Sequence, residues 1–427
     1  MGGSIHAPWS YDAVLYELNI RQFTPEGTFA AAAERFGALR AMGVDALWLM
    51  PVHPIGEEQR KGSLGSYYSV RDYTAVNPEF GTMADFDALV SRAHELGMKV
   101  LLDWVANHTA RDARWVEEKP ADWYERDADG QPAVPWDWTD TAKLNYANHD
   151  VWVGQTEAMR FWVEQHGVDG FRCDMAMLVP IEFWQEAVKE LRRVKPDLFM
   201  LAEAEEQNLF DHAFDASYTW QLHHLMNDVA QHKCRVWPLR DYLYADAMRY
   251  PATAMRLMFT SNHDENTWNG SEFSRMGAAA NAMAALTFVL PQGMPLIYTG
   301  QEVGLDRSFP FFDRAPIEDW QPNEHTDLYR RLCAAKHANV ALRAGELGGM
   351  MVEIENNAKD CMLSFVRERE ENRVVVLFNL SPYTILADFD TGIYAGSYTD
   401  VMTGEQYELP AHVRHEMAPW TFLILAK

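Results

Sequence analysis

The chain has 427 residues, 48% of them apolar, and a net charge of −25 from 37 Lys and Arg against 62 Asp and Glu. It is too long for a small module and long enough to enclose a large core. Nucleic acid and anionic membranes are unfavourable partners, because such polyanions would repel a chain of this charge. The longest apolar run, residues 282–290, is far shorter than a membrane span, so no membrane partner is expected.

The first ten residues bear on where the protein works in the cell. They hold no charged region followed by an apolar one, so no signal peptide is visible there. The opening Met-Gly-Gly-Ser can instead be an artificial start that took the place of one. On this interpretation a periplasmic or extracellular location is favoured over a cytoplasmic one.

In chain order, short β-branched or aromatic runs alternate with amphipathic helical patterns. We expect strands at residues 13–23, 45–51, 99–106, 170–176, 198–204, 213–218, 256–262 and 295–301. Helices are expected at residues 28–43, 83–97, 159–167, 181–196 and 279–293. Such alternation predicts a parallel sheet, and about eight units fit a (β/α)8 TIM barrel, an α/β fold.

Two stretches interrupt this alternation. After the third strand comes a segment rich in Trp, Asp and Pro that is too long for an ordinary loop, so we expect an inserted B subdomain at residues 107–146. From residue 347 the pattern changes to strands without helices, at 361–368, 373–380 and 421–426. This predicts a C-terminal antiparallel β domain at 347–427, with the barrel formed by 1–106 and 147–346.

Polar side chains gather where the predicted strands end, which is where barrel enzymes carry their active residues. They are Asp103, Asn107, His108, Arg172, Asp174, Glu203, Asn262, His263 and Asp264. Equivalent positions around a barrel converge on one mouth, so Asp174, Glu203 and Asp264 should face one cleft. Three carboxyl groups that lie so close together cannot all be ionised without repulsion, so the pKa of one must rise. Such a perturbed group is typical of an active site.

Two carboxyls with different protonation states are what retaining glycoside hydrolysis needs. Arg172 lies on the same strand face as Asp174 and should keep it ionised as the nucleophile. Glu203 has apolar sequence neighbours, which should keep it protonated as the acid. Asp264 could bind sugar hydroxyls, and the same role as neutral donors suits His108 and His263.

The strand-end segments resemble the α-amylase family of glycoside hydrolases, family 13. Four segments look like its ordered signatures, at 103–108, 170–176, 202–204 and 261–266. Three further stretches, at 43–51, 66–82 and 293–304, resemble its motifs around strands 2 and 8. The similarity runs in order from about residue 12 to 305. It implies a (β/α)8 barrel with an inserted B subdomain and a C-terminal β-sandwich domain.

The resemblance also implies a role for each residue that matches a family motif. Asp174 would be the nucleophile, Glu203 the general acid/base and Asp264 the transition-state stabiliser. Sugar contacts next to the cleaved bond would come from Arg172, His108, His263 and Tyr68, with the Tyr68 ring stacking on the sugar. Asp103 would support the site from behind.

Metal binding is an open point of this resemblance. Many family members carry Lys-His after the nucleophile, where this chain has Met177 and Leu178, so one usual element of a calcium site is missing. Asn107 matches a calcium ligand of many members, and a nearby acidic turn lies at 127–130. The four cysteines show no paired spacing for a metal or disulfide framework. We expect no required cofactor, with calcium at Asn107 as the alternative.

The function that these observations favour is a retaining hydrolase of α-1,4-glucosidic bonds in starch, maltodextrins or related α-glucans, most simply an α-amylase. An α-glucosidase, a cyclomaltodextrinase or an α-glucanotransferase of the same family would share every catalytic residue. A non-catalytic binding protein on this fold would be expected to lack one of the three acids. A metal-dependent barrel hydrolase would need a His cluster near the end of the first strand, and residues 17–23 hold no His.

Overall fold

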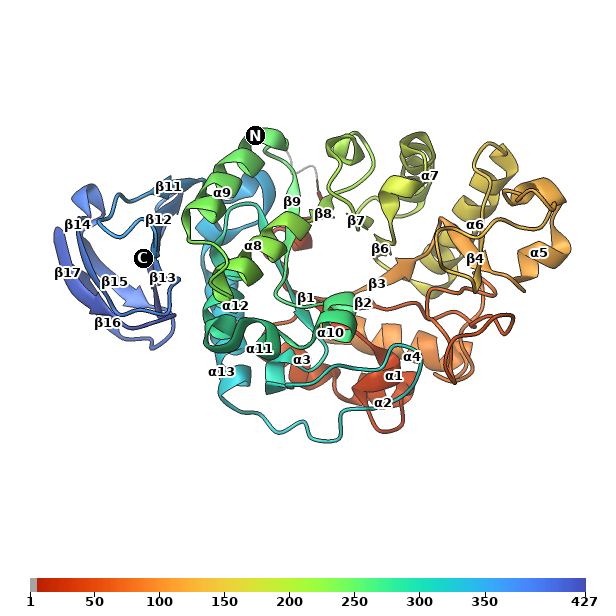
Figure 1. Cartoon of the computed structure of the whole chain (residues 1–427), viewed down its shortest axis with the longest axis horizontal. Coiled ribbons are helices and arrows are strands. Elements are labelled where there is room, and N and C mark those ends of the chain that lie inside the picture. Colours follow the sequence, from red (N-terminus) through yellow and green to blue (C-terminus); the bar gives the residue numbers. More distant parts are fainter. Residues whose placement is uncertain (1–5) are drawn as a thin grey trace. The chain divides into compact units, whose positions relative to one another are not determined.

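A computed structural model describes residues 6–427, and its central element is a closed barrel of eight strands (Figure 1). Around the barrel the strands follow the order β1-β10-β9-β8-β7-β6-β3-β2. Their bounds are Leu15–Leu18 (β1), Ala46–Leu49 (β2), Lys99–Trp104 (β3), Gly170–Cys173 (β6), Phe199–Ala202 (β7), Ala216–Tyr218 (β8), Met255–Met258 (β9) and Gly293–Tyr298 (β10). Each lies within, or largely within, a segment predicted as a strand, and the predicted α/β barrel is confirmed.

The helices agree with the predicted alternation and add to it. Their bounds are Ile20–Phe23 (α1), Phe29–Glu34 (α2), Phe36–Met42 (α3), Met83–Glu95 (α4), Arg114–Glu118 (α5), His149–His166 (α6), Ile181–Val194 (α7), Trp220–Ala230 (α8), Trp237–Arg249 (α9), His263–Asn269 (α10), Glu272–Met276 (α11), Ala280–Val289 (α12) and Glu324–Ala338 (α13). The helical pattern at 159–167 marks only the second half of α6, which starts ten residues earlier because Asn148 caps it by accepting from the amide of Asp150. Helix α4 starts at a capping box between Thr82 and Asp85.

By its contacts the chain divides into two compact units, which are described separately. We call residues 16–218 with 309–320 the N-terminal unit, and residues 6–15, 219–308 and 321–427 the C-terminal unit. The first five residues, on which the interpretation of the N-terminus rests, lie outside the described part, so the location in the cell stays a prediction. The predicted domain boundaries at 106/107, 146/147 and 346/347 also stay predictions.

Within the N-terminal unit, the segment after β3 forms a small structure of its own. It has a two-stranded antiparallel sheet of His108–Ala110 (β4) and Thr141–Lys143 (β5), with helix α5 between them in the chain. The pairing sets His108 opposite Lys143 and Ala110 opposite Thr141. The long loop between these strands therefore begins and ends beside the Ala110–Thr141 pair, two residues along β4 from His108.

The end of the C-terminal unit is an antiparallel β sandwich, as predicted. A six-stranded sheet has the order β11-β12-β13-β18-β15-β16, and β14 pairs with β17. Their bounds are Met351–Glu353 (β11), Met362–Arg369 (β12), Asn372–Asn379 (β13), Ile385–Asp390 (β14), Gly396–Asp400 (β15), Gln406–Leu409 (β16), His412–Met417 (β17) and Phe422–Ala426 (β18). Side chains from both sheets share one apolar core, including Val375, Phe389 and Met417.

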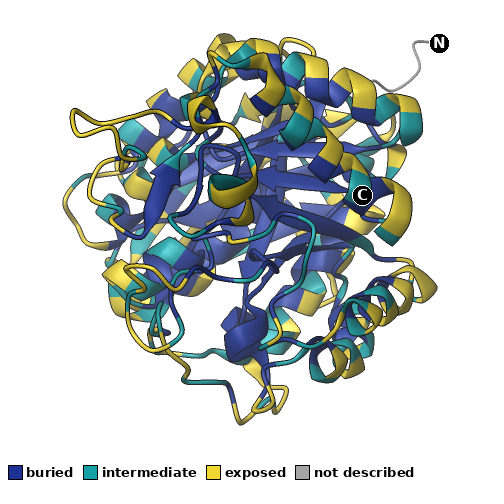
Figure 2. Ribbon diagram, turned by 90° about the vertical axis from the view of Figure 1, so that its right-hand side faces the viewer, coloured by how far each residue is buried: buried dark blue, intermediate teal, exposed yellow. Residues whose placement is uncertain are grey.

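Burial follows the layers of the fold. In Figure 2 the barrel strands are dark blue, while the helices turn yellow faces outward. Strands β1, β2, β6 and β7 are buried at every position, as expected for parallel strands that are covered on both sides. Across residues 6–427, no helix combines the length and apolarity that crossing a membrane requires.

Candidate active site

The predicted site residues of the N-terminal unit are brought together by the register of three neighbouring strands. Asp103 on β3 pairs directly with Arg172 on β6, and Cys173 pairs with Ala202 on β7. The ladder continues one step further, because Asp174 donates its amide to the Trp104 carbonyl and Glu203 donates to the Cys173 carbonyl, at 2.9 and 3.0 Å. Asp174 and Glu203 are thus the first residues after two adjacent strands, at the same end of the barrel.

Arg172 lies at the centre of this group and is fully buried. Its Nη1 donates to Asp103 Oδ1 at 2.9 Å and to Asp174 Oδ1 at 3.1 Å. Its Nη2 forms an ion pair with Glu203 Oε2 at 2.9 Å, and its Nε donates to the Tyr218 hydroxyl at 3.1 Å. Burial opposes the charge of Arg172, but Asp103 and Glu203 outweigh it and raise its pKa well above the usual value. One permanent positive charge therefore faces three carboxyl groups.

The surroundings of Glu203 correct one prediction. Its apolar sequence neighbours suggested an apolar pocket, yet its Oε2 accepts from the Met175 amide at 3.0 Å and lies against Arg172. The reason is that strand alternation turns residues 202 and 204 away from the face that Glu203 occupies, and the true partners come from β6 and the turn after it. The predicted contact between Asp174 and Arg172 is present. It follows from their spacing of two residues, which places both side chains on the same side of a strand.

Asp103 is anchored by two aromatic residues. Its Oδ2 accepts from Trp48 Nε1 at 3.0 Å and from the Tyr68 hydroxyl at 2.9 Å. The Arg172 guanidinium lies 4.8 Å from the Trp48 ring centroid and 5.5 Å from that of Tyr218. Trp48 and Tyr218 were missed from the sequence, where an aromatic residue in a strand is typical of core. Their position in the predicted strands 2 and 6 was the one available signal.

Tyr68 was predicted to stack on a sugar, and its surroundings leave that role as a prediction. Its ring lies almost parallel to that of Phe311, with centroids 6.2 Å apart and an angle of 16° between the planes. Burial raises the pKa of its hydroxyl well above 10, helped by the nearby Asp103 carboxylate. The hydroxyl therefore keeps its proton near pH 7 and donates it in the hydrogen bond to Asp103.

His108 and Asn107 form a buried pair at the start of the inserted segment. The Asn107 side-chain nitrogen lies 3.2 Å from His108 Nδ1. Burial lowers the pKa of His108 to about 4, against a hydrogen bond with the Tyr68 backbone that raises it, so the ring is neutral near pH 7.

Calcium at Asn107 stays a prediction. Calcium takes six to eight oxygen ligands, and the Asn107 side chain would supply its amide oxygen, since its nitrogen lies against the His108 ring. Over the described range, 6–427, no cluster of three or more His, Cys, Asp or Glu side chains could hold a metal ion, so calcium at Asn107 would depend on carbonyl oxygens and water. The proposed chemistry uses no metal.

Asp264 and His263 belong to the C-terminal unit, at the start of helix α10. Asn262 caps the helix by accepting from the Glu265 amide at 2.9 Å, which fixes the first turn. His263 Nε2 lies 3.4 Å from Asp264 Oδ2. The His263 side chain is 3% exposed and that of Asp264 38%, so the carboxylate reaches solvent while the ring beside it is buried.

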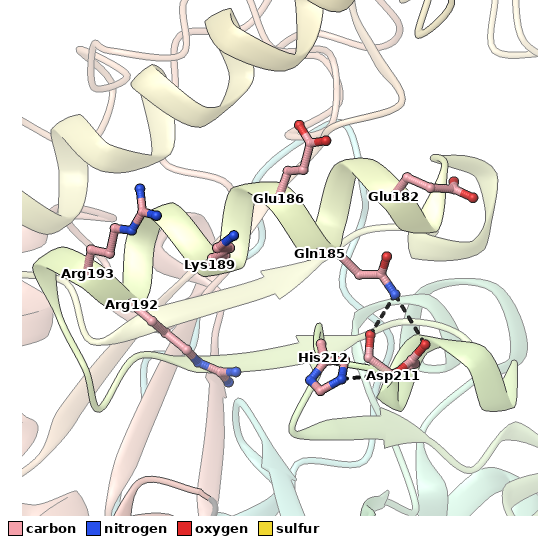
Figure 3. Close-up of a pocket in the computed structure, with 8 residues that line it drawn as sticks. All are labelled: Glu182, Gln185, Glu186, Lys189, Arg192, Arg193, Asp211 and His212. Atoms are coloured by element: carbon pink, nitrogen blue, oxygen red, sulfur yellow. Dashed lines mark hydrogen bonds and ion pairs between the residues drawn. The ribbon is translucent and has the colours of Figure 1, made fainter.

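A separate hollow of about 830 Å³ lies along the outside of helix α7. Figure 3 shows its lining, in which Gln185 and His212 reach toward Asp211 while Lys189 and Arg193 project from the helix. No predicted site residue lines it, and it has acidic and basic side chains but no Trp, Tyr or Phe. Its lining therefore offers no Trp, Tyr or Phe ring on which a sugar could stack.

The comparisons with known proteins agree with the barrel and the sandwich. The model of the α-amylase catalytic domain matches residues 15–331, and that of the α-amylase C-terminal all-β domain matches residues 354–417. Alpha-amylase MalA of Haloarcula japonica is 30% identical over 421 residues, covering 93% of this chain, which spans 59% of that relative. Alpha-amylase 3 of Dictyoglomus thermophilum is 28% identical over 451 residues, covering 88% of this chain and 86% of its own.

Solved structures are similar along nearly the whole chain. An α-amylase from Lactobacillus plantarum superposes with a TM-score of 0.87 at 31% identity, covering 98% of this chain and 99% of its own. A noncanonic maltogenic α-amylase from Thermotoga neapolitana has a TM-score of 0.88 at 28% identity, with the same coverage. Since the catalytic-domain model spans most of the sequence and the fold matches at this identity, the chain belongs to the α-amylase family of glycoside hydrolases.

Proposed function

We propose that this chain is a retaining glycoside hydrolase that cleaves α-1,4-glucosidic bonds of starch, maltodextrins or related α-glucans, most simply as an α-amylase. The observation that supports it best is the shared guanidinium of Arg172, which contacts Asp174 through Nη1 and Glu203 through Nη2. Two carboxyls on neighbouring nitrogens of one arginine are close neighbours. Retaining chemistry needs carboxyls only about 5–5.5 Å apart, whereas inversion needs a wider gap for a water molecule.

In the proposed mechanism Asp174 attacks the anomeric carbon, and Glu203 protonates the departing oxygen. Arg172 stabilises the carboxylate of Asp174, as a nucleophile requires. If all three carboxyls around Arg172 were ionised, the group would carry excess negative charge, and a proton on one of them relieves it. The mechanism places that proton on Glu203, which later removes a proton from the attacking water. Asp264 is proposed to stabilise the transition state.

The substrate class follows from the relatives and is tested by product analysis. Relatives named for α-glucan chemistry include the α-amylases above and a cyclomaltodextrinase from Bacillus sp., 25% identical over 432 residues. We expect short α-linked maltooligosaccharides from maltoheptaose and no cleavage of cellohexaose. Equal cleavage of both would refute the α-glucan assignment.

The roles of the two carboxyls are tested by matched amide variants. Asp174→Asn should lose activity by roughly 10³-fold or more, because the amide cannot attack. Glu203→Gln should be less impaired on an α-glycosyl fluoride, whose leaving group needs no protonation. The control is Asp215→Asn, which removes a buried carboxylate that pairs with Arg192 at 2.9 Å outside the site. NMR should detect the α anomer of the product first, and a β anomer first would overturn the roles of Asp174 and Glu203.

The alternatives are distinguished by their products. Part of the chain is 38% identical, over 217 residues, to a maltosyltransferase from Rhodospirillum rubrum, which keeps transfer open as a second activity. Transfer would give products longer than the substrate, a cyclomaltodextrinase would open cyclodextrins faster than starch, and an α-glucosidase would release single glucose units from chain ends. A non-catalytic binding protein would retain maltoheptaose unchanged.

A further inference from the structure

Two tryptophans stand out on the inserted segment between β4 and β5. The Trp136 side chain is exposed at 62%, one of the most exposed large apolar residues between 6 and 427. Trp138 is partly buried beside it, with ring centroids 4.7 Å apart and an angle of 57° between the rings. An exposed aromatic residue with a ring partner offers a flat apolar surface that water does not favour.

This surface adjoins the candidate active site through His108. The Trp138 ring lies 5.2 Å from the His108 ring, centroid to centroid. His108, Trp138 and Trp136 thus form a row of rings that leads from a residue proposed to contact the cleaved sugar out to solvent. All three belong to the N-terminal unit and to one short segment of it.

The row is held in place by the backbone on both sides. Before it, Ala133 donates its amide to the Glu125 carbonyl at 2.8 Å. After it, the Trp138 carbonyl accepts from both the amide and the hydroxyl of Thr141, at 3.0 and 2.8 Å, and Thr141 pairs with Ala110. The loop is therefore anchored where it meets the small sheet, and a ring on it keeps its position.

Trp136 also adopts a backbone conformation that its side chain disfavours. Its φ is +50°, in the left-handed region that bulky residues rarely occupy. Such strain persists where the surroundings impose it and is concentrated at ligand clamps and active sites. Trp136 thus combines a backbone conformation that bulky residues rarely adopt with an exposed indole.

We propose that Trp136 and Trp138 form a stacking platform that binds a glucose unit of the α-glucan beyond the unit at Asp174. The apolar C–H face of a glucose ring matches an indole face in size and polarity, and each stacked ring removes apolar surface from water on both sides. The inference rests on the proposed function, since it assigns a further sugar position to the same site. The platform raises kcat/KM for long substrates relative to short ones and does not contact the reacting atoms.

The test compares a long and a short substrate. In Trp136→Ala, kcat/KM for maltoheptaose should fall about three- to tenfold, as expected for one stacked ring, while kcat/KM for maltotriose stays within about twofold of wild type. Trp136→Phe should keep most of the preference for the long substrate. The matched control is Trp237→Ala, because Trp237 on α9 is similarly exposed, at 55%, and is not among the residues proposed to bind sugar. This variant should leave kcat/KM unchanged for both substrates.

A binding measurement separates the platform from catalysis. Maltoheptaose titrated calorimetrically into Asp174→Asn should bind several-fold more weakly when Trp136→Ala is added. If wild type cleaves α-glucans but Trp136→Ala loses nothing, or loses equally on both substrates, the platform is wrong and the proposed function stands. If wild type cleaves no α-glucan and Asp174→Asn binds none, the proposed function and the platform fail together.

Discussion

Acid stability gives a quantitative prediction at His53, a buried residue of the N-terminal unit. Its side chain is 1% exposed, and its ring packs against those of Tyr73, Trp104 and Trp162 with centroids 5.5–6.1 Å apart. Nδ1 lies 3.2 Å from the Ala75 carbonyl, and Nε2 is buried without a hydrogen-bond partner. A proton added at Nε2 would have no acceptor, and burial accordingly lowers the pKa of His53 to about 4.

The lowered pKa of His53 sets the sign and size of the change in unfolding free energy with pH. The folded pKa lies below the unfolded value of 6.5, so between pH 4 and 6.5 the unfolded chain binds more protons than the folded one. Stability due to the neutral ring is therefore present above pH 6.5 and is lost as the pH falls toward 4. From these two pKa values, His53 lowers the free energy of unfolding by about 2 kcal/mol at pH 5 and by about 0.2 kcal/mol at pH 7.

The perturbation is His53→Gln, which cannot ionise and keeps an amide donor for Ala75. Urea unfolding followed by tryptophan fluorescence gives the unfolding free energy of each protein at pH 7 and pH 5. The variant should lose about 2 kcal/mol less than wild type on acidification. His412→Gln is the control, since acidic neighbours raise the pKa of this exposed histidine and its removal cannot protect against acid. Equal acid sensitivity of wild type and His53→Gln would refute the reasoning.

Three further predictions concern the site, the metal and the interior. Tyr68→Phe removes a hydrogen bond to the buried Asp103 carboxylate and should lower kcat/KM on maltoheptaose roughly 10- to 100-fold, with the melting temperature little changed. Extensive chelation should leave most activity and barely shift the melting temperature, and a large loss restored by Ca²⁺ would show that Asn107 belongs to a structural calcium site. Arg367→Leu should destabilise the C-terminal unit by about 3 kcal/mol or more in urea unfolding, because the fully buried Arg367 donates to four backbone carbonyls that leucine would leave unpaired. A loss below about 1 kcal/mol would contradict this account.

The barrel could be predicted because its signal is local and repeated. A fully buried parallel strand such as β7 reads as a short continuous apolar run, and the helix before it has an apolar stripe of helical period. The sandwich was harder, since only its long apolar strands β12, β13 and β18 stand out. Strand β17, His412–Met417, is exposed at four of six positions, so its residues look like a surface loop.

The site was predicted as far as its contacts follow from spacing along one strand. Arg172 and Asp174 are two residues apart, so their contact could be derived before the fold was known. Contacts between strands could not, because register and the direction of each side chain decide them. Glu203 therefore seemed to lie in apolar surroundings although a guanidinium lies 2.9 Å away, and Trp48 seemed to be core although its indole nitrogen holds Asp103.

The turn after β6 explains how one short segment can serve both carboxyls. Met175 has a φ of +42°, a left-handed conformation that costs free energy for a residue with a side chain. Asp174 contacts Arg172, and the very next amide, that of Met175, donates to Glu203 Oε2. The left-handed conformation then turns the chain after Met175 into the short helix Ala176–Leu178. The Met175 amide thus links the end of β6 to Glu203 through the backbone, in addition to the contacts that both carboxyls make with Arg172.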